Sequence, residues 1–186
     1  MGPMIVSNGT HSLGPQSGKI TLNVYRDGVA AKMGHNLVLE ATKWRGKAEV
    51  VGDDPAASSV QLTIDPRSLE IIDAQGGIKP LSDKDRADIK RNINDKILIT
   101  SRNPEITFRS TEVSGIAPNI KVKGNLTLAG KSRPVTLNVR VDERLDRATG
   151  KTTIQQSSFG IKPFSALFGA LKIKDSVDIQ FDIKIP

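Results

Sequence analysis

Apolar and polar residues alternate along most of this chain. In six segments the residues of one parity are mainly Ile, Leu, Val or Phe, and those between them are mainly polar: 20–25, 37–42, 60–65, 120–128, 135–142 and 173–185. A repeat of two residues is typical of a β-strand with one buried face and one solvent-facing face. Many such strands separated by turn residues predict an antiparallel sandwich or barrel.

Two connections between predicted strands carry turn signals. The segment 129–133 (Ala-Gly-Lys-Ser-Arg) joins two strong strands, and Gly130 can take the positive φ that a tight hairpin needs. The segment 147–150 (Arg-Ala-Thr-Gly) is predicted to connect the next pair. Both indicate neighbouring antiparallel strands.

One segment, residues 82–93, predicts a short surface helix instead. Ser82 is suited to the N-cap, and Asp85 stands at the N3 position of a capping box. Ile89 and Ile93 are four residues apart and therefore share a face. We expect this helix to pack on the outside of a closed sheet.

The chain length predicts one domain. It has 186 residues and a mass of 20.1 kDa, with no linker or internal repeat, so we expect a β-barrel domain over 18–186 after an N-terminal extension, 1–17. No run of apolar residues approaches the 18 that a transmembrane helix needs. Residues 1–18 lack the apolar stretch of a secretory signal, which predicts a cytoplasmic location.

Composition excludes several kinds of chemistry. There is no cysteine, so disulfides, thiolate metal sites and cysteine nucleophiles are excluded, and two histidines argue against a histidine-rich metal site. The net charge of +7 favours acidic partners, such as nucleic acid or an anionic membrane face. Aromatic residues form only 4% of the chain, too few for a base-stacking platform, so we expect no specific nucleic-acid partner.

No catalytic motif is present, which leaves His35 as the main candidate for acid–base chemistry. Walker, G-x-G-x-x-G, His-Glu-x-x-His and G-x-S-x-G patterns are all missing. His35 stands at the start of a predicted strand, where a structural hydrogen bond is the commoner role. A catalytic role requires it to point inward beside a polar partner such as Glu40.

Three of the five phenylalanines fall in one short stretch, at 159, 164 and 168. Phe164, Leu167, Phe168 and Leu171 have the spacing of one helical stripe, which predicts a loop or helical turn over about 162–171. Because strands flank this stretch, we expect it at the barrel mouth. Its large apolar side chains there would either plug the core or line a ligand entrance.

Five segments carry a resemblance to a known family. They are Gly28 to Leu37, with an early histidine at 35; Ser59 to Asp65, followed by Ser68-Leu69; Asn103 to Phe108; the hairpin Lys123 to Gly130, leading into Arg133 to Val135; and Phe159-Gly160-Ile161 before the strand 175–185. In order and spacing the chain resembles, from Gly18 onward, the YceI-like family of lipid-binding proteins, also called polyisoprenoid-binding proteins. It departs from that family at Ser158, where many members have aspartate, and in lacking their signal peptide.

The resemblance implies an antiparallel lipocalin-like β-barrel, which we expect to have about eight strands. It also implies a long isoprenoid chain inside the barrel and a non-enzymatic carrier role, with no cofactor apart from such a lipid. We expect the ligand-binding residues to be Leu37, Leu39, Leu62, Phe108, Leu126, Leu128, Leu137, Phe159, Phe181 and His35, with Phe164, Leu167 and Phe168 at the mouth. For any one of these residues, ordinary core packing is an equally good interpretation.

Two other functions fit the same residues. One is an enzyme that acts on a barrel-bound lipid with His35 as acid or base. The other is a protein-interaction domain that docks a partner, or forms a homodimer, through the loop from Phe159 to Leu171. A transient contact with a membrane surface is compatible with the positive charge.

Overall fold

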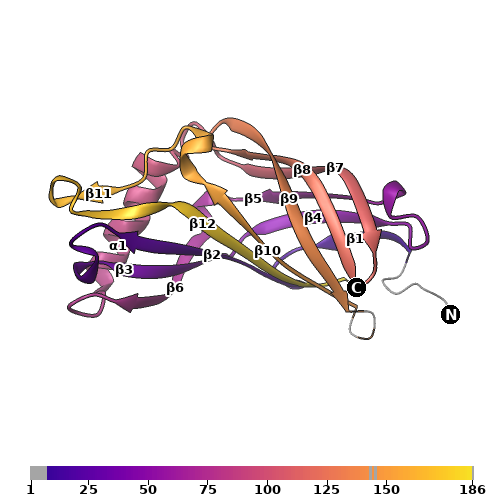
Figure 1. The fold of residues 1–186 in the computed structure, drawn as a ribbon, viewed down its shortest axis with the longest axis horizontal. Coiled ribbons are helices and arrows are strands. Elements are labelled where there is room, and N and C mark those ends of the chain that lie inside the picture. Colours follow the sequence, from indigo (N-terminus) through magenta and orange to yellow (C-terminus); the bar gives the residue numbers. More distant parts are fainter. Residues whose placement is uncertain (1–7, 143, 145, 186) are drawn as a thin grey trace.

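The computed structural model describes residues 8–142, 144 and 146–185 (Figure 1). Those residues form twelve strands: β1 Gly9–Leu13, β2 Gly18–Asp27, β3 His35–Ala41, β4 Trp44–Val50, β5 Ser59–Ile64, β6 Leu69–Gly76, β7 Ile106–Ile116, β8 Asn119–Leu128, β9 Lys131–Asp142, β10 Arg147–Gln155, β11 Ser165–Ala166 and β12 Leu171–Lys184. The helices are α1 Asp83–Asn92, the π-helical turn η4 Ile93–Ile97, and the 3-10 turns η1 Ala31–Met33, η2 Pro55–Ala57, η3 Pro66–Ser68, η5 Gln156–Phe159 and η6 Leu167–Gly169.

All the strands belong to one antiparallel sheet. The strand order is β1-β4-β5-β7-β8-β9-β10-β12-β2-β3-β6, and β11 pairs with β12. Leu13 in β1, Val113 in β7 and Ile183 in β12 belong to the same buried cluster, so the sheet curls around a single core. Among the described residues the edge strands β1 and β6 do not pair with each other, which makes this a curled half-barrel.

The fold class matches the prediction, but there are twelve strands rather than about eight. β1, β4, β6, β7 and β10 lie outside the segments of clear alternation, and β11 has only two residues. β1 also falls within the predicted N-terminal extension, yet it pairs with β4 from Gly9 to Leu13. Residues 1–7 of that extension lie outside the described residues.

The two predicted turns have different outcomes. Ala129 and Gly130 form a two-residue hairpin turn with φ of 51° and 79°, and Leu128 pairs with Lys131, as the sequence predicts. The segment 147–150 is wrongly predicted as a turn, because it begins β10 and pairs with both β9 and β12. Ala148 lines the cavity and Gly150 lies under the Phe181 ring, so the inward positions carry small residues, which look like a turn in sequence.

The predicted helix is confirmed, together with its cap. The Ser82 hydroxyl accepts a hydrogen bond from the Asp85 N–H at 3.1 Å, and the Asp85 carboxylate accepts one from the Ser82 N–H at 3.0 Å. The hydrogen bond from the Ser82 backbone N–H, followed by that from the Ser82 side chain, holds the pKa of the Asp85 carboxyl below its usual value. The guanidinium of Arg86 reaches the Ile71 carbonyl at 3.4 Å, and Lys90 pairs with Glu70, so α1 lies along β6.

The buried core lies inside the curl of the sheet. Its buried members include Trp44, Leu98, Phe108 and Phe159. No helix in the described part of the chain is long and apolar enough to cross a membrane.

Candidate functional site

An apolar cavity of about 310 Å³ runs inside the curled sheet. Its walls come from the inward-facing positions of most strands, because alternation along each strand points every second side chain at the lumen. Polar lining residues are few, and Glu49, Ser58, Ser59 and Thr152 are among them. For scale, an apolar cavity of about 150 Å³ holds a benzene molecule. This cavity therefore has room for roughly a dozen carbon atoms.

Two aromatic rings line the cavity without crossing it. Phe108 in β7 lies over Gly124 in β8, and Phe181 in β12 lies over Gly150, its partner in β10. A Cβ atom at either glycine would overlap the ring. Each glycine therefore leaves space for a phenyl ring against the wall of the sheet, which keeps the lumen open.

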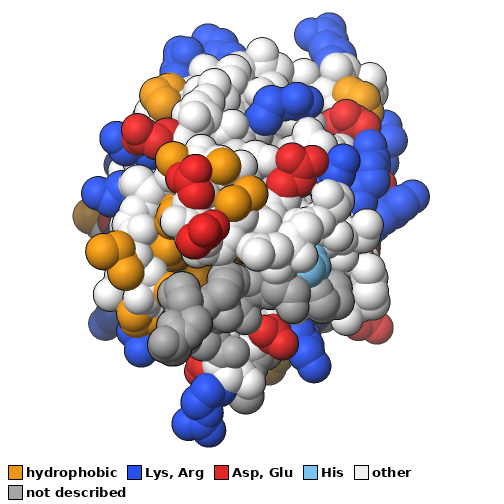
Figure 2. Space-filling view, turned by 90° about the vertical axis from the view of Figure 1, so that its right-hand side faces the viewer, with side chains coloured by type: hydrophobic (Ala, Val, Ile, Leu, Met, Phe, Trp, Pro, Cys, Tyr) orange, Lys and Arg blue, Asp and Glu red, His pale blue; other side chains and the backbone are white. Residues whose placement is uncertain are grey.

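The cavity reaches the surface near the loop between β4 and β5. Exposed residues of this region, Glu49, Val51 and Ser59, belong to its lining, together with Pro55 of η2. Figure 2 looks onto this end of the molecule, where acidic and hydrophobic side chains lie close together. We call this end the mouth.

The other end of the lumen is filled by side chains. Beyond the lining residues Ile64 and Leu128, the core contains Trp44 and Phe159, which are 5% and 2% exposed. Trp44 pairs with Ile64 across β4 and β5, and its indole N–H is buried without a hydrogen-bond partner. This packed layer forms the floor of the cavity.

The structure brings about half of the predicted ligand-binding residues to the cavity. Those that line it are Leu62, Phe108, Leu126, Leu128, Leu137 and Phe181. Leu37 and Leu39 are buried as expected but lie outside the lining, and Phe159 is part of the floor. Sequence reasoning missed further lining residues with the same alternation, among them Ile20, Leu22, Val60, Val122, Ile179 and Ile183.

Phe164, Leu167 and Phe168 do not line the cavity, which corrects their expected place at its entrance. They lie around the hairpin of β11 and β12, at the end of the molecule opposite the mouth (Figure 1). The predicted loop or helical turn is present, but the apolar stripe is not, because Leu167 and Phe168 take left-handed φ values of 53° and 54°. Phe168 is fully exposed as a result.

His35 lies outside the cavity lining. Its Nε2 is 2.8 Å from the carbonyl oxygen of Lys79, and a carbonyl can only accept, so Nε2 carries the proton. The bond joins the start of β3 to the loop after β6. This geometry fits a structural hydrogen bond rather than chemistry on a lipid in the lumen.

The resolved pKa shifts at the sheet belong to its outer face. The Asp178 carboxylate accepts hydrogen bonds from Thr153 at 2.6 Å and Tyr25 at 2.7 Å, and these two bonds lower its pKa. The bond to Asp178 raises the pKa of Tyr25 in turn. Asp182 lies on β12, as Asp178 does, and a hydrogen bond from Arg147 on β10 lowers its pKa. Among the described residues no group of three or more His, Asp or Glu could hold a metal ion.

The sequence model of one family matches this chain. It is that of the YceI-like domain, and it matches residues 15–185. Among curated relatives, UPF0312 protein PA0423 of Pseudomonas aeruginosa is 32% identical over 117 residues, which cover 59% of this chain and 55% of the relative. UPF0312 protein Ent638_1570 of Enterobacter sp. is 32% identical over 89 residues, covering 47% of this chain and 40% of that relative. The matched region thus spans about half the length of these relatives.

Solved structures share the fold at low identity. BcnA of Burkholderia cenocepacia superposes with a TM-score of 0.70 and 20% identity, covering 92% of this chain and 98% of that chain. A polyisoprenoid-binding domain from Saccharophagus degradans, implicated in plant cell wall breakdown, gives a TM-score of 0.56 at 16% identity, covering 97% of this chain and 100% of that one.

Proposed function

The chain belongs to the YceI-like domain family, and from this premise we propose that it is a non-enzymatic carrier that holds a long apolar chain, an isoprenoid or a related lipid, inside its curled sheet. The observation that carries the proposal is the apolar cavity of about 310 Å³, open at the mouth and floored by Trp44 and Phe159. The polyisoprenoid-binding domain with the same fold supports the chemical class of the ligand.

The gross energy of apolar burial in the cavity is comparable to the energy that such a ligand needs. About a dozen methylene groups at ~0.8 kcal/mol each give a gross gain of about 10 kcal/mol. Loss of free motion opposes this gain, and a net affinity in the micromolar range needs about −8 kcal/mol. Because the cavity holds only part of a long isoprenoid, the rest of the chain would extend through the mouth.

The lining offers little for catalysis. Its acidic side chain, Glu49, lies exposed at the rim, and His35 is held elsewhere by the Lys79 carbonyl. A carrier needs only an apolar wall and an opening to the surface, and the cavity has both. A cytoplasmic location stays a prediction from the sequence, and fractionation of cells that produce the chain would check it.

Organic extraction of the purified protein, followed by mass spectrometry, tests the proposal. We expect an isoprenoid or other lipid with a long hydrocarbon tail. Ala48 is buried and lines the cavity, so Ala48→Phe should fill the lumen and remove the lipid. Ala87→Phe makes the same change at an exposed position of α1 and should leave the lipid in place.

A refilling assay with farnesol, a short isoprenoid alcohol, completes the test. The delipidated wild type and the Ala87→Phe variant should take up farnesol, and Ala48→Phe should not. Uptake by all three proteins, or by none, would contradict a binding site inside the lumen.

A further inference from the structure

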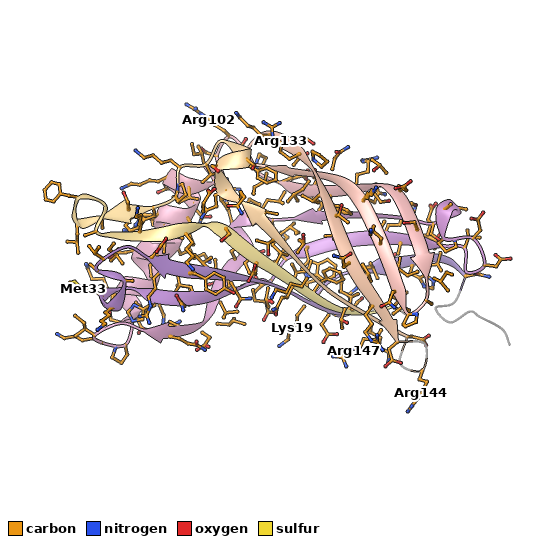
Figure 3. All side chains as sticks on the ribbon, viewed as in Figure 1. Lys19, Met33, Arg102, Arg133, Arg144 and Arg147 are labelled. Atoms are coloured by element: carbon orange, nitrogen blue, oxygen red, sulfur yellow. The ribbon has the colours of Figure 1, made fainter. Side chains whose placement is uncertain are left out.

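Three loops come together at the end of the molecule opposite the mouth. They are residues 28–34 between β2 and β3, 77–82 after β6, and 161–172 around β11, and together we call them the distal tip. The Ala30 N–H donates to the Ala170 carbonyl at 2.8 Å, and the His35 side chain donates to the Lys79 carbonyl at 2.8 Å. The loops therefore form one continuous surface. Figure 3 places Met33 at this end and Arg144 at the other.

The distal tip concentrates exposed hydrophobic side chains. Val29 is 96% exposed, Ile78 is 72% exposed and Phe168 is fully exposed. Of the ten large hydrophobic residues that the described chain exposes, six belong to the tip: Val29, Met33, Ile78, Phe164, Leu167 and Phe168. Single exposed hydrophobic residues are ordinary, but a cluster indicates a contact surface.

The conformation of the hairpin also points to a function. Leu167 and Phe168 have φ of 53° and 54°, a region that glycine, asparagine and aspartate adopt far more readily than bulky side chains. A turn selected only for folding would place small or polar residues there. The strained backbone instead holds the Phe168 ring away from the protein, where it packs against no core residue.

Lysines predominate within these loops, and acidic residues flank them. The three tip segments contain four exposed lysines, Lys32, Lys79, Lys162 and Lys172, while exposed Asp27 faces Lys172 across β2 and β12 and exposed Asp83 follows the second segment. At the mouth, residues 51–58 contain Asp53 and Asp54 and no Lys or Arg. An anionic surface would therefore attract the lysines of the tip and repel the acidic loop at residues 51–58.

We propose that the distal tip docks onto anionic lipid bilayers, with Leu167 and Phe168 inserted among the headgroups and the surrounding lysines in contact with lipid phosphates. Exposed aliphatic and phenyl groups with lysines on the same loops match the depth and charge of a bilayer interface. A second copy of the chain fits less well, because a symmetric contact would set lysine against lysine. The docked molecule would turn its mouth away from the bilayer.

Vesicle sedimentation tests this docking with the full chain. Vesicles of equal parts phosphatidylcholine and phosphatidylserine should bind the protein, and vesicles of phosphatidylcholine alone should bind it at least about tenfold more weakly. Added salt should weaken binding to the anionic vesicles, because it screens the lysines. Failure of the wild type to bind anionic vesicles overturns the proposal.

Two pairs of variants compare substitutions in the distal tip with control substitutions elsewhere on the surface. Leu167→Ser with Phe168→Ser should weaken vesicle binding at least about tenfold, while Ile116→Ser, at a hydrophobic position near the mouth that is 85% exposed, should not. Lys162→Glu with Lys172→Glu should also weaken it, and Lys121→Glu with Lys184→Glu, on exposed strand positions, should change it less. Equal binding by the tip variants and their controls overturns the proposal.

A site-specific dye gives a readout that does not depend on affinity. Because the chain has no cysteine, Phe168→Cys and Ile116→Cys each create one labelling site for an environment-sensitive fluorophore. Vesicles should shift the emission of the label at 168 to the blue and leave the label at 116 unchanged. A shift at 116 alone overturns the proposed orientation. A vesicle-independent dimer that the Leu167→Ser, Phe168→Ser variant abolishes would assign the tip to self-association instead.

Discussion

The ring of Phe181 occupies the space that a side chain at position 150 would need. Gly150 is the register partner of Phe181 across β10 and β12, and a Cβ at position 150 would overlap the ring. The glycine therefore fixes where the ring lies, and with it the width of the lumen. On β7 and β8 the Phe108 ring likewise lies over Gly124, although Gly124 is the register partner of Ser110.

Gly150→Ala should narrow the lumen and destabilise the fold. Gly150 lies inside a strand without positive φ, so the added methyl group acts mainly through the Phe181 ring and the nearby Asn138 carbonyl. We expect a loss of about 1–3 kcal/mol in the free energy of unfolding, as for other overpacked interiors. Urea denaturation measures this loss. Farnesol titration of the delipidated protein measures how far the narrower lumen weakens binding.

Phe181→Leu combined with Gly150→Ala provides the control. A smaller side chain at 181 should restore part of the stability, with the remainder due to the contact at Asn138. The interaction energy from the double-mutant cycle should therefore be favourable. Additive losses would show that the ring does not depend on the glycine.

Removal of the lipid that we propose for the lumen should lower stability. At about 24 cal/mol per Å³, an empty apolar cavity of about 310 Å³ costs up to ~7 kcal/mol relative to a filled one, and water entering at the mouth reduces this cost. Farnesol added to the delipidated protein should raise its melting temperature in proportion to occupancy, as calorimetry can record. Ala48→Phe, with its lumen already filled, should not respond. An equal rise in the melting temperature of both proteins would show that farnesol binds outside the lumen.

Alternation in the sequence predicts which side chains of a strand are buried, but not which of them line the cavity. Leu62 and Phe108 alternate correctly and are register partners on the cavity wall. Leu37 and Leu39 fit the alternation equally well and are buried, but they do not line the cavity. A period of two fixes which face of a strand is buried, whereas the width of the lumen depends on strand order and on glycines such as Gly150.

The Phe-rich segment shows a second limit of the pattern. The spacing of Phe164, Leu167 and Leu171 fits a helical stripe, but Ala166 pairs with Leu171 across a hairpin. Pairing with β12 overrides the local preference, and the left-handed φ of Phe168 follows from the tight connection. Capping of the helix at Ser82 is local chemistry, which explains why the sequence located α1 correctly.

Acid should destabilise the fold partly through Asp178. Its carboxylate has a folded-state pKa below the usual 3.8, mainly because Thr153 and then Tyr25 donate hydrogen bonds to it. A depressed pKa adds stability that is fully present above the usual value and is lost as pH falls through the folded-state pKa. Asp178→Asn should be less stable at neutral pH, and its stability should fall less between about pH 4 and pH 2.

The two donors to Asp178 provide an internal comparison. Thr153→Val should raise the carboxyl pKa more than Tyr25→Phe does, since the Thr153 bond is the larger cause. Carboxyl chemical shifts followed by NMR through an acid titration measure both values. A pKa of Asp178 that neither substitution moves would contradict the assignment.

His35→Gln separates a structural histidine from a catalytic one. The Nε2 proton of His35 bonds to the Lys79 carbonyl, and a glutamine amide can donate to the same oxygen. We therefore expect a loss of no more than about 1 kcal/mol in stability, the usual net value of one hydrogen bond. Mass spectrometry of the extracted lipid should find the same molecule in the variant and the wild type. If His35 acted as acid or base on a lipid in the lumen, His35→Gln would instead accumulate an unreacted precursor of different mass.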